Sequence, residues 1–106
     1  MNKEISAADA AILRTNNKEA VFLDVREDAE LAICRIDGAF HIPMSEVPVR
    51  HEALPKDVPL VVLCHHGMRS LSVVQYLEAK GYKNAINLSG GIHAWAIEVD
   101  PGMQRY

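Results

Sequence analysis

Residues 59–70 read P-L-V-V-L-C-H-H-G-M-R-S, and their pattern is the strongest indication of the fold class. The uninterrupted apolar run Leu60–Leu63 predicts a short strand buried on both faces, as in a parallel sheet. Gly67 marks a turn, and from Met68 to Lys80 apolar side chains recur at helical spacing. Gly81 then stands where a left-handed helix cap is favoured. A buried strand that turns directly into a helix indicates an α/β protein.

Outward from this stretch, short apolar runs alternate with helical patterns. Ser6 and Asp9 form a helix-start signature, so we expect a helix from Ser6 to Arg14. The other expected elements are a strand at Val21–Leu23 ending in Asp24, a short helix capped by Asp28 and ending at Ile33, a strand at Ala39–Ile42, a helix at Ser45–Leu54 weakened by Pro48, a strand at Ala85–Leu88 and a last helix opened by Gly90-Gly91. This order predicts a small, mostly parallel β-sheet with α-helices on both faces.

Composition narrows the class of protein. The chain has 106 residues, 49 % of them hydrophobic, so we expect one domain spanning residues 1–106. The net charge of -3 and the lack of a basic run argue against nucleic-acid binding. The first residues offer no apolar stretch for a signal peptide or membrane span, so we expect a cytoplasmic protein. Cys34 and Cys64 are too few for a disulfide framework, and we expect free thiols.

The chemistry concentrates in the loop that follows the central strand. Ligands of open α/β sheets bind beyond the carboxyl ends of strands, where successive backbone N–H groups and a helix N-terminus favour an anion. Cys64 occupies this position, Gly67 permits the turn, and Arg69 adds positive charge. The pKa of Cys64 should therefore lie below about 8.5, which would make it a nucleophile. The alternative is a cysteine that only packs at a strand end.

Four ordered motifs resemble the rhodanese-like family, whose active-site loop begins with a nucleophilic cysteine and runs C-x-x-G-x-R. The matching segments are Leu23–Glu27 with Glu30, Gly38–Pro43, Cys64–Arg69, and Leu88–Ile92 with Ala94-Trp95. The related phosphatase loop is C-x5-R, whereas Cys64 to Arg69 is C-x4-R. The shorter loop forms a tighter pocket, which suits a single sulfur better than a tetrahedral phosphate.

The resemblance implies a rhodanese-like fold and a sulfurtransferase that uses no metal or organic cofactor. Cys64 would take sulfane sulfur from thiosulfate or a persulfide as a covalent persulfide and pass it to cyanide, a thiol or a partner protein. The substrate-binding loop would comprise His65, His66, Gly67, Met68, Arg69 and Ser70. Many rhodanese loops carry Arg or Lys where His65 or His66 stands, so we expect weak thiosulfate binding. A non-catalytic binding or regulatory module is the alternative, and a carrier that relays sulfur between proteins stays open.

Several side chains have two interpretations. Arg69 either contacts the anionic donor or clamps the loop through Asp24 or Glu30. Asp24 and Arg26, with Glu30, either form an ion-pair network that supports the loop or have a catalytic role, and we interpret them as support.

The remaining histidines and Cys34 have weaker functional signals. Adjacent residues such as His65 and His66 rarely converge on one ion and no third ligand is evident, so we expect no metal. We expect His41 and His93 to be surface or packing residues, and Trp95 to anchor the last helix. Cys34 is expected to be a bystander thiol rather than a resolving cysteine.

Overall fold

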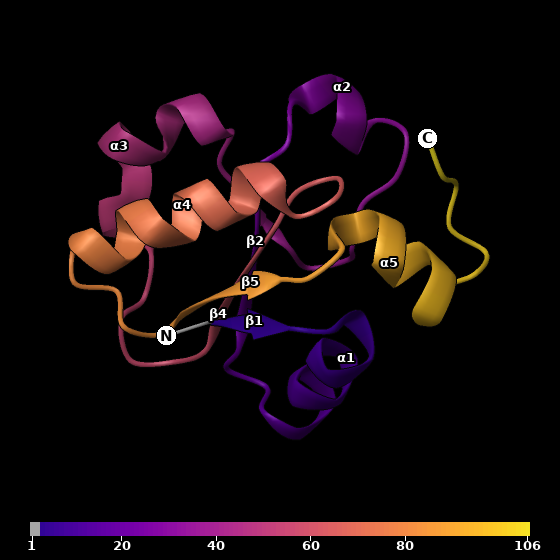
Figure 1. Cartoon of the computed structure of the whole chain (residues 1–106), viewed down its shortest axis with the longest axis horizontal. Helices are drawn as coiled ribbons and strands as arrows, with labels where there is room; N and C mark the ends of the chain where they lie inside the picture. Colours follow the sequence, from indigo (N-terminus) through magenta and orange to yellow (C-terminus); the bar gives the residue numbers. More distant parts are fainter. Residues whose placement is uncertain (1–2) are drawn as a thin grey trace.

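The structure, a computed structural model, describes residues 3–106. It contains an all-parallel five-stranded sheet with the order β1-β5-β4-β2-β3 (Figure 1). The strands are β1 (Glu4–Ile5), β2 (Val21–Asp24), β3 (Phe40–His41), β4 (Leu60–Leu63) and β5 (Ala85–Leu88). The helices are α1 (Ala7–Asn16), α2 (Asp28–Leu31), α3 (Val47–Arg50), α4 (Met68–Ala79) and α5 (Gly91–Glu98), with 3-10 turns η1 (Met44–Glu46) and η2 (His51–Ala53) on either side of α3. The predicted α/β class is confirmed.

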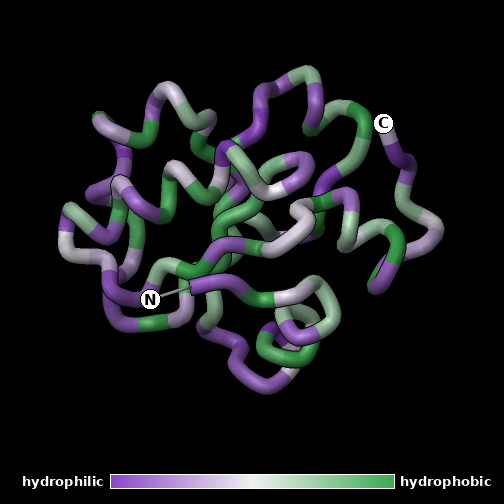
Figure 2. The backbone as a smooth tube through the Cα atoms, in the orientation of Figure 1, coloured by the Kyte–Doolittle hydropathy of each residue, from purple (hydrophilic) through white to green (hydrophobic). Residues whose placement is uncertain are grey.

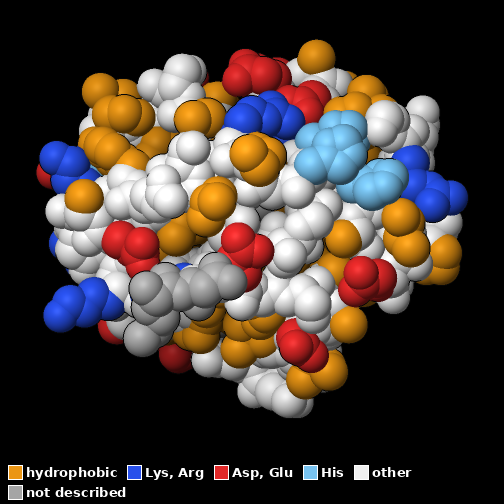
Figure 3. Space-filling model, in the orientation of Figure 1, with side chains coloured by type: hydrophobic (Ala, Val, Ile, Leu, Met, Phe, Trp, Pro, Cys, Tyr) orange, Lys and Arg blue, Asp and Glu red, His pale blue; other side chains and the backbone are white. Residues whose placement is uncertain are grey.

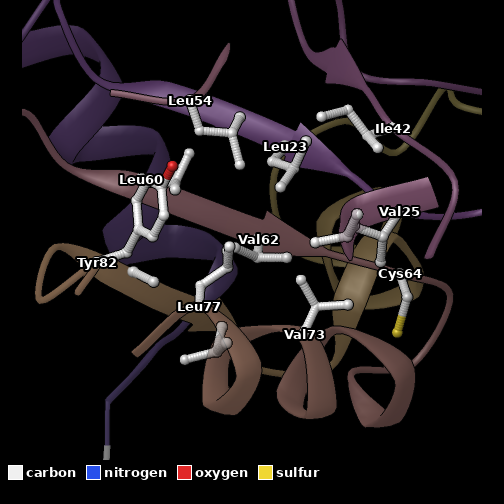
Figure 4. Packing of buried hydrophobic residues seen from close by; sticks show 13 residues of the cluster. Leu23, Val25, Ile42, Leu54, Leu60, Val62, Cys64, Val73, Leu77 and Tyr82 are labelled. Atoms are coloured by element: carbon white, nitrogen blue, oxygen red, sulfur yellow. The ribbon is translucent and has the colours of Figure 1, made fainter. Parts of the chain in front are cut away.

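Helices cover both faces of the sheet because successive strand residues point to opposite sides. From β4, Leu60 and Val62 face a core closed by α4, while Val61 and Leu63 face a second core closed by α1 and α5. Cys64 continues the alternation and belongs to the α4 side. Figure 2 shows the hydrophobic colouring concentrated along the central strands, and Figure 4 shows the α4-side core. The strand that carries the loop is therefore packed on both faces.

The expected element order matches the structure, with differences at the ends of elements. Ser6 is the N-cap of α1 and accepts a hydrogen bond from Asp9 N at 3.1 Å, as predicted. The cap of α2 is Glu27 rather than Asp28, because Glu27 and Glu30 form a reciprocal capping box. Glu30 Oε1 accepts from Glu27 N at 3.1 Å, and Glu30 N also donates to Glu27 O at 3.0 Å, so the start of α2 holds Glu30 in place.

Two segments depart further from expectation. The helix expected over Ser45–Leu54 is divided into η1, α3 and η2, with Pro48 placed in the first turn of α3, where its missing N–H is tolerated. The sequence did not indicate β1, because two residues are too short to show a pattern. Its pairing with β5 is extended by the 2.8 Å bonds from Asn87 N to Lys3 O and from Ser89 N to Ile5 O. None of the helices within residues 3–106 is long and apolar enough to cross a membrane.

Candidate active site

The active-site loop connects the carboxyl end of β4 to the first turn of α4 (Figure 4). Gly67 is the N-cap of α4 and has φ +108°, in the left-handed region that favours glycine. A Cβ there would lie 3.5 Å from Leu88 O and 3.4 Å from Gly90 N. These are ordinary van der Waals distances, so glycine is required here by the left-handed backbone of the turn rather than by lack of space.

The Cys64 sulfur lies at the focus of this loop. Its Sγ accepts hydrogen bonds from Gly67 N at 3.1 Å and Ser70 N at 3.3 Å, and Ser70 Oγ lies within hydrogen-bonding distance at 3.3 Å. The residue is only 1 % exposed. The donors form a concave nest, and the positive end of the α4 dipole points toward the same sulfur. The loop can therefore stabilise a thiolate or another anionic sulfur species.

Burial and hydrogen bonding act in opposite directions on the thiol. Burial raises the pKa of Cys64, but the Ser70 hydroxyl and the backbone N–H groups of Ser70, Gly67 and His66 lower it, and the net result is a lowered pKa. The hydrogen bonds therefore outweigh the desolvation, in agreement with the sequence-based prediction. Arg69 contributes less directly than expected, because its guanidinium is paired with another residue.

This geometry predicts early ionisation of Cys64. In a Cys34→Ser background, where Cys64 is the only thiol, the iodoacetamide reaction rate should reach its plateau with a midpoint below the free-cysteine value of about 8.5. Ser70→Ala removes one hydroxyl and should move the midpoint upward. A pH series of pseudo-first-order alkylation rates measures both, and a wild-type midpoint at or above the free value would contradict the depressed pKa.

Asn87 forms a second layer of support that the sequence-based site omitted. It lies on β5, is 1 % exposed, and its Nδ2 donates to Gly67 O at 3.1 Å. Its Oδ1 accepts from Ser70 Oγ at 2.5 Å. The Ser70 hydroxyl has one proton, so Asn87 and the Cys64 sulfur compete for it. A buried amide within the otherwise apolar run Ala85–Leu88 was the available signal.

Truncation of Asn87 should impair the loop rather than only the fold. Asn87→Ala leaves Gly67 O without its side-chain donor and frees the Ser70 hydroxyl, so we expect slower sulfur loading and a changed Cys64 ionisation midpoint. Asn84→Ala is the matched control, because Asn84 Nδ2 also donates to backbone carbonyls, those of Pro55 and Val58, outside the loop. Each variant should lose about 1–3 kcal/mol of stability by denaturant titration. Equal loading rates in the two variants would refute a positioning role for Asn87.

The acidic and basic side chains form a connected network beside the loop. Arg69 Nη1 and Nη2 donate to Glu30 Oε1 and Oε2 at 2.7 and 2.9 Å, a bidentate pair. Arg26 pairs with Asp24 at 2.8 Å, and its Nη1 also donates to Glu30 O at 3.3 Å. The Arg69 hydrogen bonds hold the pKa of Glu30 well below its usual range, although burial acts in the opposite direction. Arg69 was expected either to contact the anionic donor or to clamp the loop through an acidic residue. Its pairing with Glu30 matches the clamp.

Tyr106 joins this network, although no sequence pattern indicated it. Its hydroxyl donates to Glu30 Oε2 at 2.7 Å and accepts from Arg26 Nη1 at 2.9 Å. Its ring stacks on His65, with centroids 3.8 Å apart and planes at 10°. Burial raises the pKa of Tyr106 to about 12, so the hydroxyl keeps its proton and remains a donor. The tail after α5 carries no periodic pattern, which is why only the structure locates this contact.

His93, expected to be a surface or packing residue, lies beside the loop and close to His65 and His66. One ligand nitrogen from each of His65, His66 and His93 lies within 4.8 Å of the others, so the third histidine that the sequence did not reveal is present. Burial and the neighbouring His66 lower the pKa of His65, which favours its neutral form. His93 comes from α5, and a sequence separation of 27 residues hid its proximity.

The other singled-out residues lie as follows. Trp95 packs edge-on against Phe22 with ring centroids 5.5 Å apart, as expected for an anchor of α5. His41 Nε2 donates to Arg26 O at 2.7 Å. Cys34 is half-buried and its thiol is free. Its backbone carbonyl accepts a hydrogen bond from Arg26 Nη2 at 2.8 Å. Met68 begins α4 and is 76 % exposed, so its side chain does not contribute to the nest.

Comparison with known proteins agrees with this architecture. The rhodanese-like domain family matches residues 7–98. YtwF of Bacillus subtilis is 41 % identical over 93 % of this chain and 95 % of its own length, and thiosulfate sulfurtransferase GlpE of Coxiella burnetii is 34 % identical over 90 % and 88 %. A rhodanese-related crystal structure from Thermoplasma volcanium has a TM-score of 0.81 at 37 % identity, covering 92 % of this chain and 93 % of that one. The chain therefore belongs to the rhodanese-like domain family, and its relatives include proteins named as sulfurtransferases.

Proposed function

We propose that the protein transfers sulfane sulfur through a persulfide on Cys64. The observation that carries this proposal is the Cys64 sulfur facing two backbone N–H donors and the Ser70 hydroxyl at the N-terminus of α4. Such preorganised donors stabilise negative charge without reorganising during the reaction. The family's sulfurtransferases supply the reaction class, and the loop supplies a nucleophile with a lowered pKa.

The proposed reaction has two half-reactions. The Cys64 thiolate attacks the outer sulfur of the donor, forming a new S–S bond while the donor's own S–S bond breaks. With thiosulfate, the bonding electron pair leaves with sulfite; with a persulfide, it leaves with a thiolate. A thiophilic acceptor then attacks the outer sulfur of the Cys64 persulfide, and the Cys64 thiolate departs with the electrons of that bond. The cycle is covalent ping-pong catalysis and requires no metal or organic cofactor.

The charged network has a positioning role in this proposal. Glu30 holds both terminal guanidinium nitrogens of Arg69, Nη1 and Nη2, so the first turn of α4 is tied to α2 at the edge of the loop. Arg69 in that state is a weak receptor for a free anion, because its best hydrogen-bonding edge is occupied. The backbone nest therefore carries most of the stabilisation of the sulfur anion, and Arg69 mainly holds the loop geometry.

A two-step experiment tests the function. The purified 106-residue chain is incubated with thiosulfate or a small persulfide, and intact mass spectrometry follows the addition of one sulfur. Cyanide is then added and thiocyanate release is measured. We expect stoichiometric loading followed by loss of the added sulfur with matching thiocyanate. Failure to load from either donor would overturn the proposed transferase and favour the non-catalytic module.

Thiosulfate should be a donor with a high KM. Arg69 is the single Lys or Arg in Cys64–Ser70 and is paired with Glu30, so a dianion meets little uncompensated positive charge. His66 is exposed, whereas His65 is stacked under Tyr106, so His66→Lys adds a cation with least disturbance. It should lower the thiosulfate KM about fivefold, equivalent to about 1 kcal/mol for an exposed charge pair, and less at high salt.

The control for that effect is His66→Gln, which removes the imidazole without adding charge. The thiosulfate KM of the wild type, His66→Lys and His66→Gln is measured by steady-state kinetics at two ionic strengths. A chelator is present so that metal ions do not affect the comparison. A KM that falls equally in His66→Lys and His66→Gln, or does not fall in His66→Lys, would rule out electrostatic control of donor binding. A persulfide donor of low net charge should show little response to the same substitution.

A further inference from the structure

A cluster of three imidazoles lies beside the loop and has no role in the sulfur chemistry above. It contains His65 and His66 from the loop and His93 from α5, with one nitrogen of each within 4.8 Å of the other two. Figure 3 shows histidine side chains gathered in a compact pale-blue patch on one face of the molecule. His66 is exposed, so the cluster is open to solvent on that side.

Two nitrogens of this cluster have unmet hydrogen-bonding capacity. His65 Nε2 and His93 Nδ1 are both buried and have no hydrogen-bond partner within residues 3–106. A buried polar atom without a hydrogen bond lowers the stability of the folded state by about 1–3 kcal/mol, so two such atoms in one cluster indicate an unidentified partner. Both atoms belong to residues of the same cluster, and a shared ligand would account for the two together.

The backbone holds the two segments of the cluster in a fixed relation. Ile92 N donates to Cys64 O at 2.9 Å and His93 N donates to His65 O at 3.1 Å, which ties the start of α5 to the loop. Gly91 makes this approach possible, because a Cβ there would lie 2.4 Å from His65 O. Stacking on Tyr106 further fixes the His65 ring. The backbone therefore holds the residues that carry the imidazoles close together.

We propose that His65, His66 and His93 form a binding site for a divalent transition-metal ion of the Zn²⁺ class. Neutral imidazoles are preferred ligands of Zn²⁺, Co²⁺, Ni²⁺ and Cu²⁺, and three of them leave one position for water or an exogenous ligand. Tetrahedral coordination at about 2.0–2.1 Å places nitrogens about 3.4 Å apart, so the ligands must move closer by a modest amount. The exposed ring of His66 has the freedom to do so. The absence of a carboxylate from the trio disfavours Mg²⁺ and Ca²⁺.

The test uses the 106-residue chain without a histidine tag. Zn²⁺ titration calorimetry and Co²⁺ absorption spectra should reveal one saturable site in the wild type. Cys64→Ser should retain it, because the proposed ligands exclude the thiolate. His66→Ala and His93→Ala should weaken Zn²⁺ binding by more than the about 10–100-fold typical of losing an outer partner. His41→Ala is the control outside the cluster and should bind like the wild type.

The outcomes separate this site from the active-site thiol. Wild-type affinity in His66→Ala, or no saturable binding in the wild type, would overturn the proposal. If Zn²⁺ binding disappears in Cys64→Ser but persists in His66→Ala, the ion binds to the thiolate. That result would also overturn the proposal. Because His66 is exposed, its substitution disturbs the core least, so His66→Ala remains decisive if His93→Ala fails to fold. The metal measurement requires no sulfur transfer, so it stands or falls separately from the proposed function.

Discussion

Cys64→Ser is expected to abolish sulfur loading, whereas Cys34→Ser retains it. The Cys64 sulfur is the atom toward which the loop donors converge, with Gly67 N at 3.1 Å and Ser70 N at 3.3 Å. A serine hydroxyl in the same place would remain protonated at neutral pH and could not form a persulfide. Cys34 instead lies beside Arg26, with its Sγ 4.0 Å from Nη1 and outside the loop.

Two measurements on the same samples check this result. Intact mass after incubation with thiosulfate or a persulfide should show the added sulfur in wild type and Cys34→Ser alone, and cyanide should release thiocyanate from the same two proteins. Thermal midpoints identify any folding defect in Cys64→Ser, which is a near-isosteric change at a buried site. Normal loading and turnover in Cys64→Ser would remove Cys64 as the nucleophile.

The central part of the fold could be predicted because its signals are local. The apolar run Leu60–Leu63 is long enough to indicate a buried strand, and Gly67 followed by a periodic helix indicates the turn. Cys64 stands between them, so its place at a helix N-terminus follows from the order of residues alone. The structure confirms each of these elements.

The surroundings of the site could not be predicted in the same way, because they depend on residues far apart in sequence. Asn87, His93 and Tyr106 approach the loop from β5, α5 and the tail. Their contacts arise from the parallel order that places β5 beside β4, and from a tail that packs back on the loop. A buried amide in a strand is a detectable signal, whereas a lone terminal tyrosine is not.

The network beneath the loop contains two ion pairs that differ in their environment. Asp24 and Arg26 are 1 % and 0 % exposed in their side chains, whereas Arg69 and Glu30 are 36 % and 19 % exposed. Water screens the second pair and reduces its contribution to stability. The Asp24–Arg26 pair is shielded from water, so water cannot hydrogen-bond to either residue when its partner is removed. The largest effect on stability is therefore expected where Arg26 loses its buried counter-charge.

Asp24→Asn should lower the free energy of unfolding by about 3–5 kcal/mol, because it leaves the Arg26 guanidinium buried without its carboxylate. The Asp24 side chain accepts from Arg26 Nε and Nη2, and from the Arg26 backbone N at 3.0 Å, so its loss affects the turn after β2 as well. Glu46→Gln is the matched control. Its pair with Arg50 is also 2.8 Å long, but both side chains are about half exposed, and its loss should cost under about 1 kcal/mol.

Urea denaturation of the two single variants and of the double variant Asp24→Leu with Arg26→Met separates charge burial from packing. Replacing both charges with apolar groups of similar volume removes the uncompensated cation, so the double variant should recover at least half of the stability lost in Asp24→Asn. If the double variant is less stable than Asp24→Asn, the shape and hydrogen bonds of Arg26, including those to Tyr106 and the Cys34 carbonyl, matter more than its charge balance. If Asp24→Asn costs no more than Glu46→Gln, burial of the pair does not determine its contribution.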